Sequence, residues 1–164
     1  MIKIRTLFSL FILLSGCSFE TPTEFSKEAL NDQVTSLDGT VSTFKEVVNL
    51  YKGKKVVVSV WASWCADCIK GLPKVKQLQK EFPEVVFLFL SVDERTNSWK
   101  KGIQRFVIKG EHHNLPKGMK DGELVDFLHL SWIPRYLVLD KKGKIILYKA
   151  IKSSDKRIVE ALKS

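Results

Sequence analysis

The stretch VVVSVWASWCADCIKGLPKV, residues 56–75, decides the fold. Its first part is β-branched and almost wholly apolar, which is typical of a strand buried on both faces. Two cysteines, Cys65 and Cys68, follow at the point where this run gives way to a polar turn. Apolar residues then recur at helical spacing, at Leu72, Val75, Leu78 and Phe82. The cysteines therefore stand where a buried strand is expected to end and a helix to begin.

This placement predicts thiol–disulfide chemistry. The N-terminus of a helix carries unpaired N–H groups and a partial positive charge, which stabilise a thiolate. Cys65 at the cap is therefore expected to become a nucleophile near neutral pH. Cys68, one turn inside the helix, would lie close enough to attack a mixed disulfide formed by Cys65.

The rest of the chain continues the alternation of strands and helices. A second continuous apolar strand is expected over residues 85–92, followed by a helix that Gly110 closes. Residues 111–121 are expected to be a loop, followed by a short helical piece. A hairpin and a closing helix come last, with strands over residues 136–140 and 144–151 and the helix over 155–162. This order indicates an α/β three-layer sandwich.

The N-terminus indicates export. Residues 1–16 combine basic side chains, a short apolar run and a small-residue exit, as secretory signal peptides do. Leu14-Ser15-Gly16-Cys17 resembles the lipobox of bacterial lipoproteins, which implies cleavage before Cys17 and a lipid on its thiol. We expect a lipidated spacer over residues 17–32 and a domain over 33–164. The protein would then be anchored to a bacterial membrane, facing the periplasm, without a transmembrane helix.

Charge is a weak guide to partners. The chain carries a formal net charge of +9, but its lysines are scattered through many segments. A solvated basic surface near anionic lipid headgroups explains this balance better than nucleic-acid binding.

The motifs resemble those of the thioredoxin superfamily. WASWCADC, followed by Pro73, is similar to the family's W-C-x-x-C motif, and Trp132-Ile133-Pro134 to its cis-proline loop. SVDE at 91–94 and LVLDKKGKI at 137–145 are similar to membrane-anchored TlpA-like and ResA-like proteins. The resemblance implies a three-layer α/β/α sandwich with a central mixed sheet.

The same resemblance assigns roles to residues. Cys65 would be the attacking thiol and Cys68 the resolving one. Pro134 would follow a cis peptide bond, with Ile133 offering its backbone to an incoming peptide and Trp64 helping to dock the partner chain. No metal or organic cofactor is implied.

Some residues depart from the family pattern. Ser59 and Gly71 stand where relatives carry acidic groups that move protons for the resolving thiol. Asp67 is the nearest candidate acceptor, although an acidic residue in a first helical turn is favourable in itself. Arg135, after the expected cis-proline, is interpreted as an exposed residue at a strand end.

Other functions must be weighed. Cys65 and Cys68 in a purely structural disulfide would enclose too short a loop to stabilise much. A zinc site needs four ligands, and His112, His113 and His129 are expected at the surface. A Sco-like copper module would use the same cysteines plus a histidine, but those proteins typically space the thiols C-x-x-x-C.

The favoured function is a thiol–disulfide oxidoreductase acting on exported proteins that contain disulfides. Acidic Asp67 should disfavour a very stable thiolate, which favours a reductase over a disulfide-donating oxidant. A reductase in an oxidising compartment must be recharged, so a membrane electron donor of the DsbD or CcdA kind is implied.

Overall fold

The computed structural model describes residues 21–164, so the predicted signal peptide and Cys17 lie outside the described residues. A seven-stranded sheet with the order β2-β1-β5-β4-β3-β6-β7 forms the middle of this part of the chain. The strands are Gln33–Ser36 (β1), Val41–Thr43 (β2), Val56–Trp61 (β3), Val86–Ser91 (β4), Glu111–Asn114 (β5), Arg135–Leu139 (β6) and Ile145–Ala150 (β7). β4 pairs in parallel with β3 and β5, and the other pairs are antiparallel, so the sheet is mixed.

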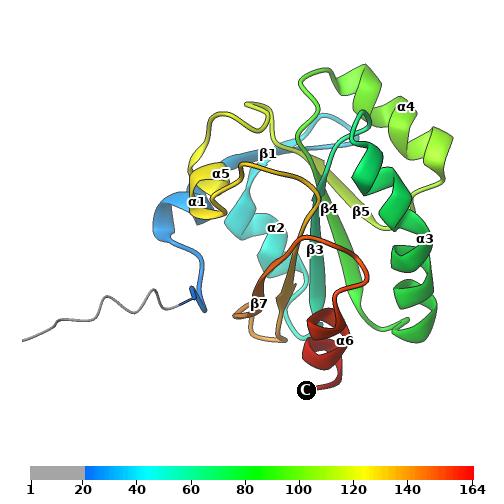
Figure 1. Cartoon of the computed structure of the whole chain (residues 1–164). Coiled ribbons are helices and arrows are strands. Elements are labelled where there is room, and N and C mark those ends of the chain that lie inside the picture. The colour runs from blue at the N-terminus through cyan, green and yellow to red at the C-terminus, as the bar shows by residue number, and fades with distance from the viewer. Residues whose placement is uncertain (1–20) are drawn as a thin grey trace, which may run out of the picture.

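Helices cover both faces of this sheet. They are Lys27–Asn31 (α1), Phe44–Leu50 (α2), Ala66–Glu81 (α3), Thr96–Phe106 (α4), Glu123–Phe127 (α5) and Lys156–Lys163 (α6). α3, α4 and α6 lie on one side, and α1, α2 and α5 on the other (Figure 1). The predicted α/β three-layer sandwich with a central mixed sheet is therefore confirmed.

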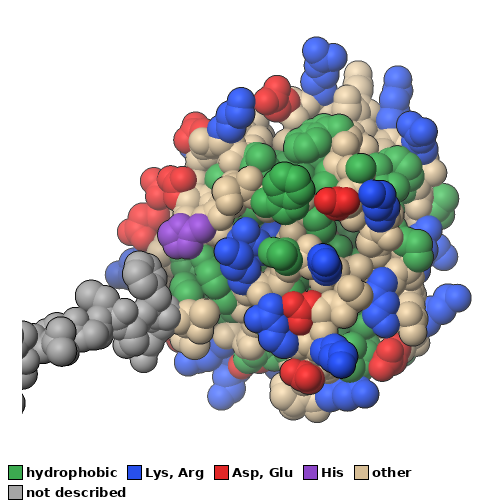
Figure 2. Space-filling view, viewed as in Figure 1, with side chains coloured by type: hydrophobic (Ala, Val, Ile, Leu, Met, Phe, Trp, Pro, Cys, Tyr) green, Lys and Arg blue, Asp and Glu red, His purple; other side chains and the backbone are tan. Residues whose placement is uncertain are grey.

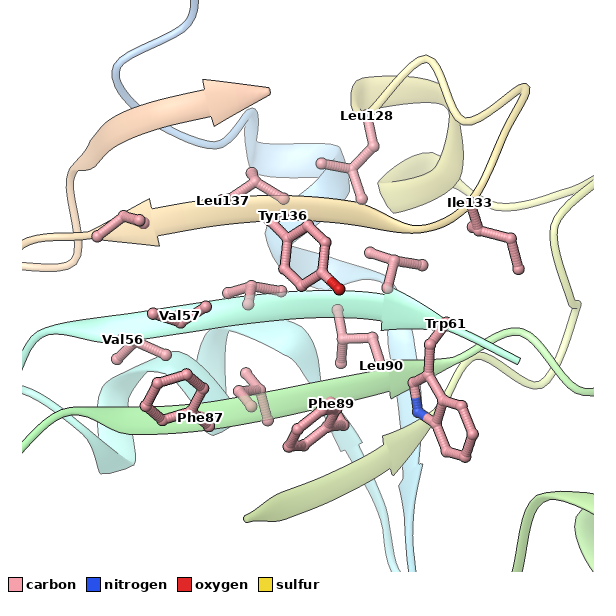
Figure 3. Packing of buried hydrophobic residues seen from close by; sticks show 14 of the residues in the cluster. Val56, Val57, Trp61, Phe87, Phe89, Leu90, Leu128, Ile133, Tyr136 and Leu137 are labelled. Carbon is pink, nitrogen blue, oxygen red and sulfur yellow. The ribbon is translucent and has the colours of Figure 1, made fainter. Parts of the chain in front are cut away.

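The central strands make the core. All six residues of β3 and five of the six in β4 are buried, because both faces of these strands are covered by helices. Apolar side chains from β3, β4 and β6 interlock around them (Figure 3). The continuous apolar runs in the sequence correspond to these strands.

Strand pairing brings the two cysteines and the Ile133-Pro134 segment to the same end of the sheet, where β3 ends and β6 begins. α3 begins just beyond the carboxyl end of β3. β6 runs antiparallel to β3, with Val60 opposite Arg135, so the start of β6 lies beside the end of β3. The Ile133-Pro134 segment is therefore brought next to Cys65, although the two are far apart in the sequence.

The segment expected as a loop over residues 111–121 begins with a strand. β5 carries the polar sequence EHHN, which shows no apolar alternation, yet His112, His113 and Asn114 are buried. The His112 ring stacks on Phe89 with 5.2 Å between centroids, and the Asn114 amide donates to the carbonyl oxygens of Ser91 and Asp93. The preceding helix α4 ends at Phe106, and its C-cap Val107 lies in the left-handed region, so the helix ends before Gly110.

Part of the segment expected as a spacer, residues 17–32, is structured. α1 begins after Ser26, whose hydroxyl accepts a hydrogen bond from the N–H of Ala29, and Ala29 is fully buried. The Phe25 ring packs against Phe44 and Phe127 at centroid distances of 5.0 and 5.2 Å. The sequence pattern does not predict this helix, because the segment is short and polar and its contacts are made with distant helices. Within residues 21–164, no helix has the length and apolar character needed to cross a membrane.

Candidate active site

Cys65 and Cys68 form a disulfide at the start of α3, with 5.3 Å between their Cα atoms. Cys65 is the N-cap of the helix, and its Sγ lies 3.1 Å from the backbone nitrogen of Cys68, whose N–H points at it. In the reduced protein this N–H and the helix N-terminus would stabilise a thiolate on Cys65. The strand-to-helix position predicted for the cysteines is therefore correct.

The two cysteines are only slightly exposed. Cys65 retains 6% of its accessible surface and Cys68 retains 3%. Cys65 lines an open pocket, a hollow of about 360 Å³ in which Trp64, Met119 and Trp132 also take part. An incoming disulfide can therefore reach Cys65 from this hollow, whereas Cys68 lies inside the first turn of α3.

The Ile133–Pro134 peptide bond is cis, as the family resemblance implied. The carbonyl oxygen of Ile133 lies 3.7 Å from the Sγ of Cys65. Ile133 is 4% exposed and contributes to the pocket at Cys65. The loop predicted to face the cysteines thus lies directly beside the sulfur of Cys65.

The four tryptophans divide into two pairs. Trp61 and Trp99 are buried in the core, whereas Trp64 and Trp132 are each 61% exposed. Both exposed rings line the pocket at Cys65, and its wall is mostly apolar. Figure 2 shows apolar side chains gathered near the middle of one face, with Lys and Arg side chains spread around them. Exposed tryptophans of this kind commonly mark contact surfaces for other proteins.

Asp67 lies in the first turn of α3 with its side chain 55% exposed, 3.7 Å from the Nζ of Lys70. It lines the pocket at Cys65 and a second pocket beyond Trp132. Its place next to the cysteines agrees with the sequence motif.

Asp93 is a site residue that the sequence reasoning missed. Its carboxylate is 1% exposed and accepts hydrogen bonds from the backbone N–H and the hydroxyl of Ser63, at 2.9 and 2.7 Å. A third hydrogen bond comes from the Ser91 hydroxyl at 2.8 Å. Ser63 directly precedes Trp64 and Cys65, so this carboxylate holds the loop that carries them. The sequence did offer a signal for this role. Asp93 follows the apolar run of β4, and β4 pairs with β3, the strand that leads to the cysteines.

Arg135 is buried, with 2% of its surface exposed, so its interpretation as an exposed strand-end residue was wrong. One guanidinium nitrogen donates to the carbonyl oxygen of Leu128, at the end of α5. Burial lowers the pKa of Arg135, and the neighbouring Tyr148 opposes this shift. The side chain thereby ties the start of β6 to α5, across the segment that contains the cis-proline loop.

The histidines give no metal site in the described residues. His112 and His113 are buried in β5, contrary to the expectation that they lie at the surface, whereas His129 is exposed. Between residues 21 and 164, no three His, Cys, Asp or Glu side chains are grouped so that they could hold a metal ion. A copper centre built from Cys65, Cys68 and a histidine therefore finds no support in this part of the chain.

A thioredoxin-like family model matches residues 53–145. This match covers more than half of the chain and contains both cysteines and the cis-proline loop. The chain belongs to the thioredoxin-like family. Its place in that family fits the strand–cysteine–helix arrangement found at Cys65 and Cys68.

Among curated relatives, this thioredoxin-like protein is similar to thiol-disulfide oxidoreductase ResA. It is 30% identical over 159 residues to ResA of Bacillus thuringiensis subsp. konkukian, with 88% of this chain and 87% of the relative covered. ResA of Bacillus cereus strain ATCC 10987 is 31% identical over the same length and with the same coverage.

A solved structure gives the same picture. The solution structure of a putative thiol-disulfide oxidoreductase from Bacteroides vulgatus has a TM-score of 0.68 and 26% identity, covering 84% of this chain and 88% of its own. This thioredoxin-like protein is therefore a thiol-disulfide oxidoreductase, with Cys65 and Cys68 as its cysteine pair.

Proposed function

We propose that this chain is an exported, lipid-anchored protein disulfide reductase that works through Cys65 and Cys68. The observation that carries the proposal is the geometry at Cys65. Its sulfur caps a helix, receives the Cys68 N–H at 3.1 Å, and lines an apolar pocket open to a partner. A nucleophilic sulfur with a second sulfur behind it is what two-step disulfide exchange requires.

The reaction proceeds in two exchanges. The Cys65 thiolate attacks one sulfur of the substrate disulfide, forming a mixed disulfide and releasing the other substrate sulfur as a thiolate that takes up a proton. The Cys68 thiolate then attacks the Cys65 sulfur, which releases the second substrate thiol and leaves the Cys65–Cys68 disulfide. Two electrons pass from the protein to the substrate, and a dithiol donor must return them.

Docking would involve the residues around the pocket. Trp64 and Trp132 offer exposed rings, and the carbonyl of Ile133, next to Pro134, faces the Cys65 sulfur at 3.7 Å. We assign the substrate backbone to the Ile133 segment. Asp67, which directly precedes Cys68 in the sequence, remains the candidate acceptor for the Cys68 proton.

Export and anchoring rest on the sequence before residue 21. Cleavage before Cys17 and lipid attachment to it would hold the domain at a membrane. In an oxidising compartment the Cys65–Cys68 pair is continually oxidised, so a membrane dithiol donor of the DsbD or CcdA kind would recharge it. Cys17→Ser in the full chain should move the protein from the membrane fraction to the soluble one. Membrane association of that variant equal to the native chain would reject the anchor.

The test of direction is the reduction potential of the Cys65–Cys68 pair, measured by equilibrating the purified protein with defined dithiol buffers. A value near about −270 mV, as in thioredoxin, supports a reductase. A value near about −120 mV, as in a strong oxidant, would make the protein a disulfide donor. Cys65→Ser should abolish exchange with any disulfide, and a variant that kept full activity would reject the proposed site.

A further inference from the structure

A second hollow adjoins the pocket at Cys65. It has a volume of about 510 Å³ and shares Asp67 and Trp132 with that pocket. Its other walls come from α3 and from the segment that follows β7, including Ile151 and Lys152. We call this hollow the lysine groove. A chain lying in the apolar pocket can continue into the lysine groove without leaving the surface.

The lysine groove has an excess of positive charge. It contains three lysines, Lys70, Lys74 and Lys152, and one acidic residue, Asp67. Asp67 pairs only with Lys70, at 3.7 Å between side chains that are both mostly exposed. The Lys74 ammonium contacts the neutral amide oxygen of Gln77, at 3.1 Å. In residues 21–164, neither Lys74 nor Lys152 has a carboxylate within 4.0 Å.

Asp155, which follows the groove residue Ser154 in the sequence, does not neutralise the groove. Asp155 is bound by Arg157, with three hydrogen bonds from the guanidinium at 2.6 to 3.3 Å. This pairing lowers the pKa of Asp155. The positive charge of the lysine groove is therefore left for an external partner.

The lining of the groove at Gly71 is packed closely against the segment that follows β7. Gly71 lies there without a side chain, and a Cβ at this position would come within 3.0 Å of the Ser153 hydroxyl oxygen and 3.3 Å of the Tyr136 hydroxyl oxygen. The Ser153 hydroxyl donates to the Gly71 carbonyl oxygen at 3.0 Å. Gly71, Ser153 and Ser154 line the groove together with the three lysines.

The spacing of the groove residues along α3 indicates which residues of a bound peptide would lie beside the lysines. Asp67, Lys70, Gly71 and Lys74 follow one face of the helix at intervals of three or four residues. With a rise of about 1.5 Å per residue, Lys70 and Lys74 lie roughly 8 and 14 Å along the axis from Cys65. An extended peptide advances about 3.3–3.6 Å per residue. Residues about two to four positions from the substrate cysteine would therefore lie beside these lysines.

We propose that the lysine groove binds acidic residues located about two to four positions from the reactive cysteine of the substrate, while an apolar residue next to that cysteine fills the pocket between Trp64 and Trp132. The ammonium groups of Lys74 and Lys152, unpaired within the described part of the chain, together with Lys70, complement carboxylates, and two exposed indole rings complement an apolar side chain. The substrate class is thus a protein disulfide with an apolar-then-acidic flank. This inference rests on the proposed reductase function.

Short peptides with one cysteine, held in a mixed disulfide with 2-mercaptoethanol, test this proposal. Reduction by the reduced protein gives the peptide thiol, 2-mercaptoethanol and the Cys65–Cys68 disulfide, so atoms and electrons balance. Leucine flanks the cysteine, and glutamate, glutamine or lysine occupies the next positions, on the N-terminal side in one set and the C-terminal side in another. Bis(2-hydroxyethyl) disulfide, uncharged and too small to reach the lysines, serves as the reference substrate.

The measured quantity is the second-order rate constant of each peptide, divided by that of the reference disulfide. In one of the two sets, the glutamate peptide should react about tenfold faster than the glutamine peptide, since exposed ion pairs are individually weak but three act together. This preference should vanish near 1 M salt, where the Debye length falls to about 3 Å. Replacing the flanking leucine by serine should slow both peptides.

Two triple variants with the same net charge distinguish the effect of the lysine groove from the effect of the protein's overall charge. Lys70→Glu/Lys74→Glu/Lys152→Glu should reverse the order of the glutamate and lysine peptides. Lys45→Glu/Lys52→Glu/Lys142→Glu changes the net charge equally, but these lysines line a different hollow, near the turn between β6 and β7. The second variant should keep the native order and the native reference rate.

The outcomes distinguish the two proposals. If the reduced protein reduces neither the peptides nor the reference disulfide, the proposed function fails. If it reduces the reference disulfide but treats all peptides alike, or if the control variant also reverses the order, the lysine groove is no acidic-peptide site and only the present inference is overturned.

Discussion

The carboxylate of Asp93 accepts two hydrogen bonds from Ser63, one from the backbone N–H of Ser63 at 2.9 Å and one from the Ser63 hydroxyl at 2.7 Å. Asp93 lies just beyond β4 and Ser63 just beyond β3, so the contact joins the carboxyl ends of two parallel strands. Ser63 is followed directly by Trp64 and Cys65. A buried acceptor in one connection thereby fixes the loop that presents the attacking sulfur in the next.

Asp93→Asn should weaken both stability and function. An amide presents an NH₂ group where a carboxylate oxygen accepts, so at least one of its donors would lose its acceptor inside the protein. Leaving a buried polar group without a partner costs about 1–3 kcal/mol. We expect the free energy of unfolding in urea to fall by about that amount, and the reduction of protein disulfides to slow as the loop at Trp64 loosens.

Ser63→Ala is the matched control for Asp93→Asn. It removes the hydroxyl donor but keeps the backbone N–H bond to Asp93, so its effect should be smaller, about 1 kcal/mol. Rate constants for a protein disulfide and for bis(2-hydroxyethyl) disulfide should be compared in both variants. A positioning role for Asp93 predicts that the protein disulfide is affected more. Native stability and rates in Asp93→Asn would contradict it.

Cys68→Ala should trap the reaction at its midpoint. Cys65 can still attack a disulfide from the pocket, but the sulfur that lies behind it is gone, so the mixed disulfide with the substrate should accumulate. Mass spectrometry after alkylation of free thiols would measure this adduct. Cys65→Ala provides the comparison, because Cys68 is 3% exposed and should form almost none. Equal trapping in both variants would show that the roles are not divided in this way.

Trp132→Ala should separate function from folding. The side chain is 61% exposed and lines the pocket at Cys65, so its loss should change the free energy of unfolding by no more than about 0.5 kcal/mol. The rate of protein disulfide reduction should nevertheless fall several-fold. Trp99→Ala, at a fully buried tryptophan, should instead cost about 3–5 kcal/mol. Urea unfolding and single-turnover rates measure both effects.

Much of this fold could be predicted because its signals are local. The apolar runs that became β3 and β4 are continuous, and the spacing of Leu72, Val75 and Leu78 in α3 is helical. The placement of Cys65 at the helix cap followed from these neighbours alone. The cis peptide before Pro134 was expected only through resemblance to relatives, since no local pattern indicates it.

The remaining parts depend on contacts between distant segments. β5 was missed because His112 and Asn114 are buried through stacking on Phe89 and hydrogen bonds to backbone carbonyls, which a hydropathy pattern does not register. Arg135 was wrongly predicted to be exposed for a similar reason, because its guanidinium binds the carbonyl oxygen of Leu128, at the end of α5. In each case a polar side chain is buried by a specific partner that the sequence pattern does not identify.

The buried histidines of β5 predict a loss of stability on mild acidification. Burial lowers the pKa of both His112 and His113, and Glu111 partly opposes the shift at each. Both imidazoles are then neutral in the folded protein at a pH where the unfolded chain, with a pKa of about 6.5, binds protons. Stability is therefore complete above about pH 6.5 and declines as the pH falls below it. The urea midpoint, measured from pH 7.5 to 5, should decrease.

Histidine variants test whether His112 and His113 cause this dependence of stability on pH. His112→Gln/His113→Gln should flatten the profile between about pH 7 and 5, even if its absolute stability is lower because the contact with Phe89 is lost. His129→Gln, at an exposed residue, should keep the native slope. Asp38 also favours the folded state, but its pKa is lowered to about 2 by hydrogen bonds from Ser36 and Thr40, so its contribution is lost only at more acidic pH. A slope that persists unchanged in the double variant would therefore place the titrating groups outside β5.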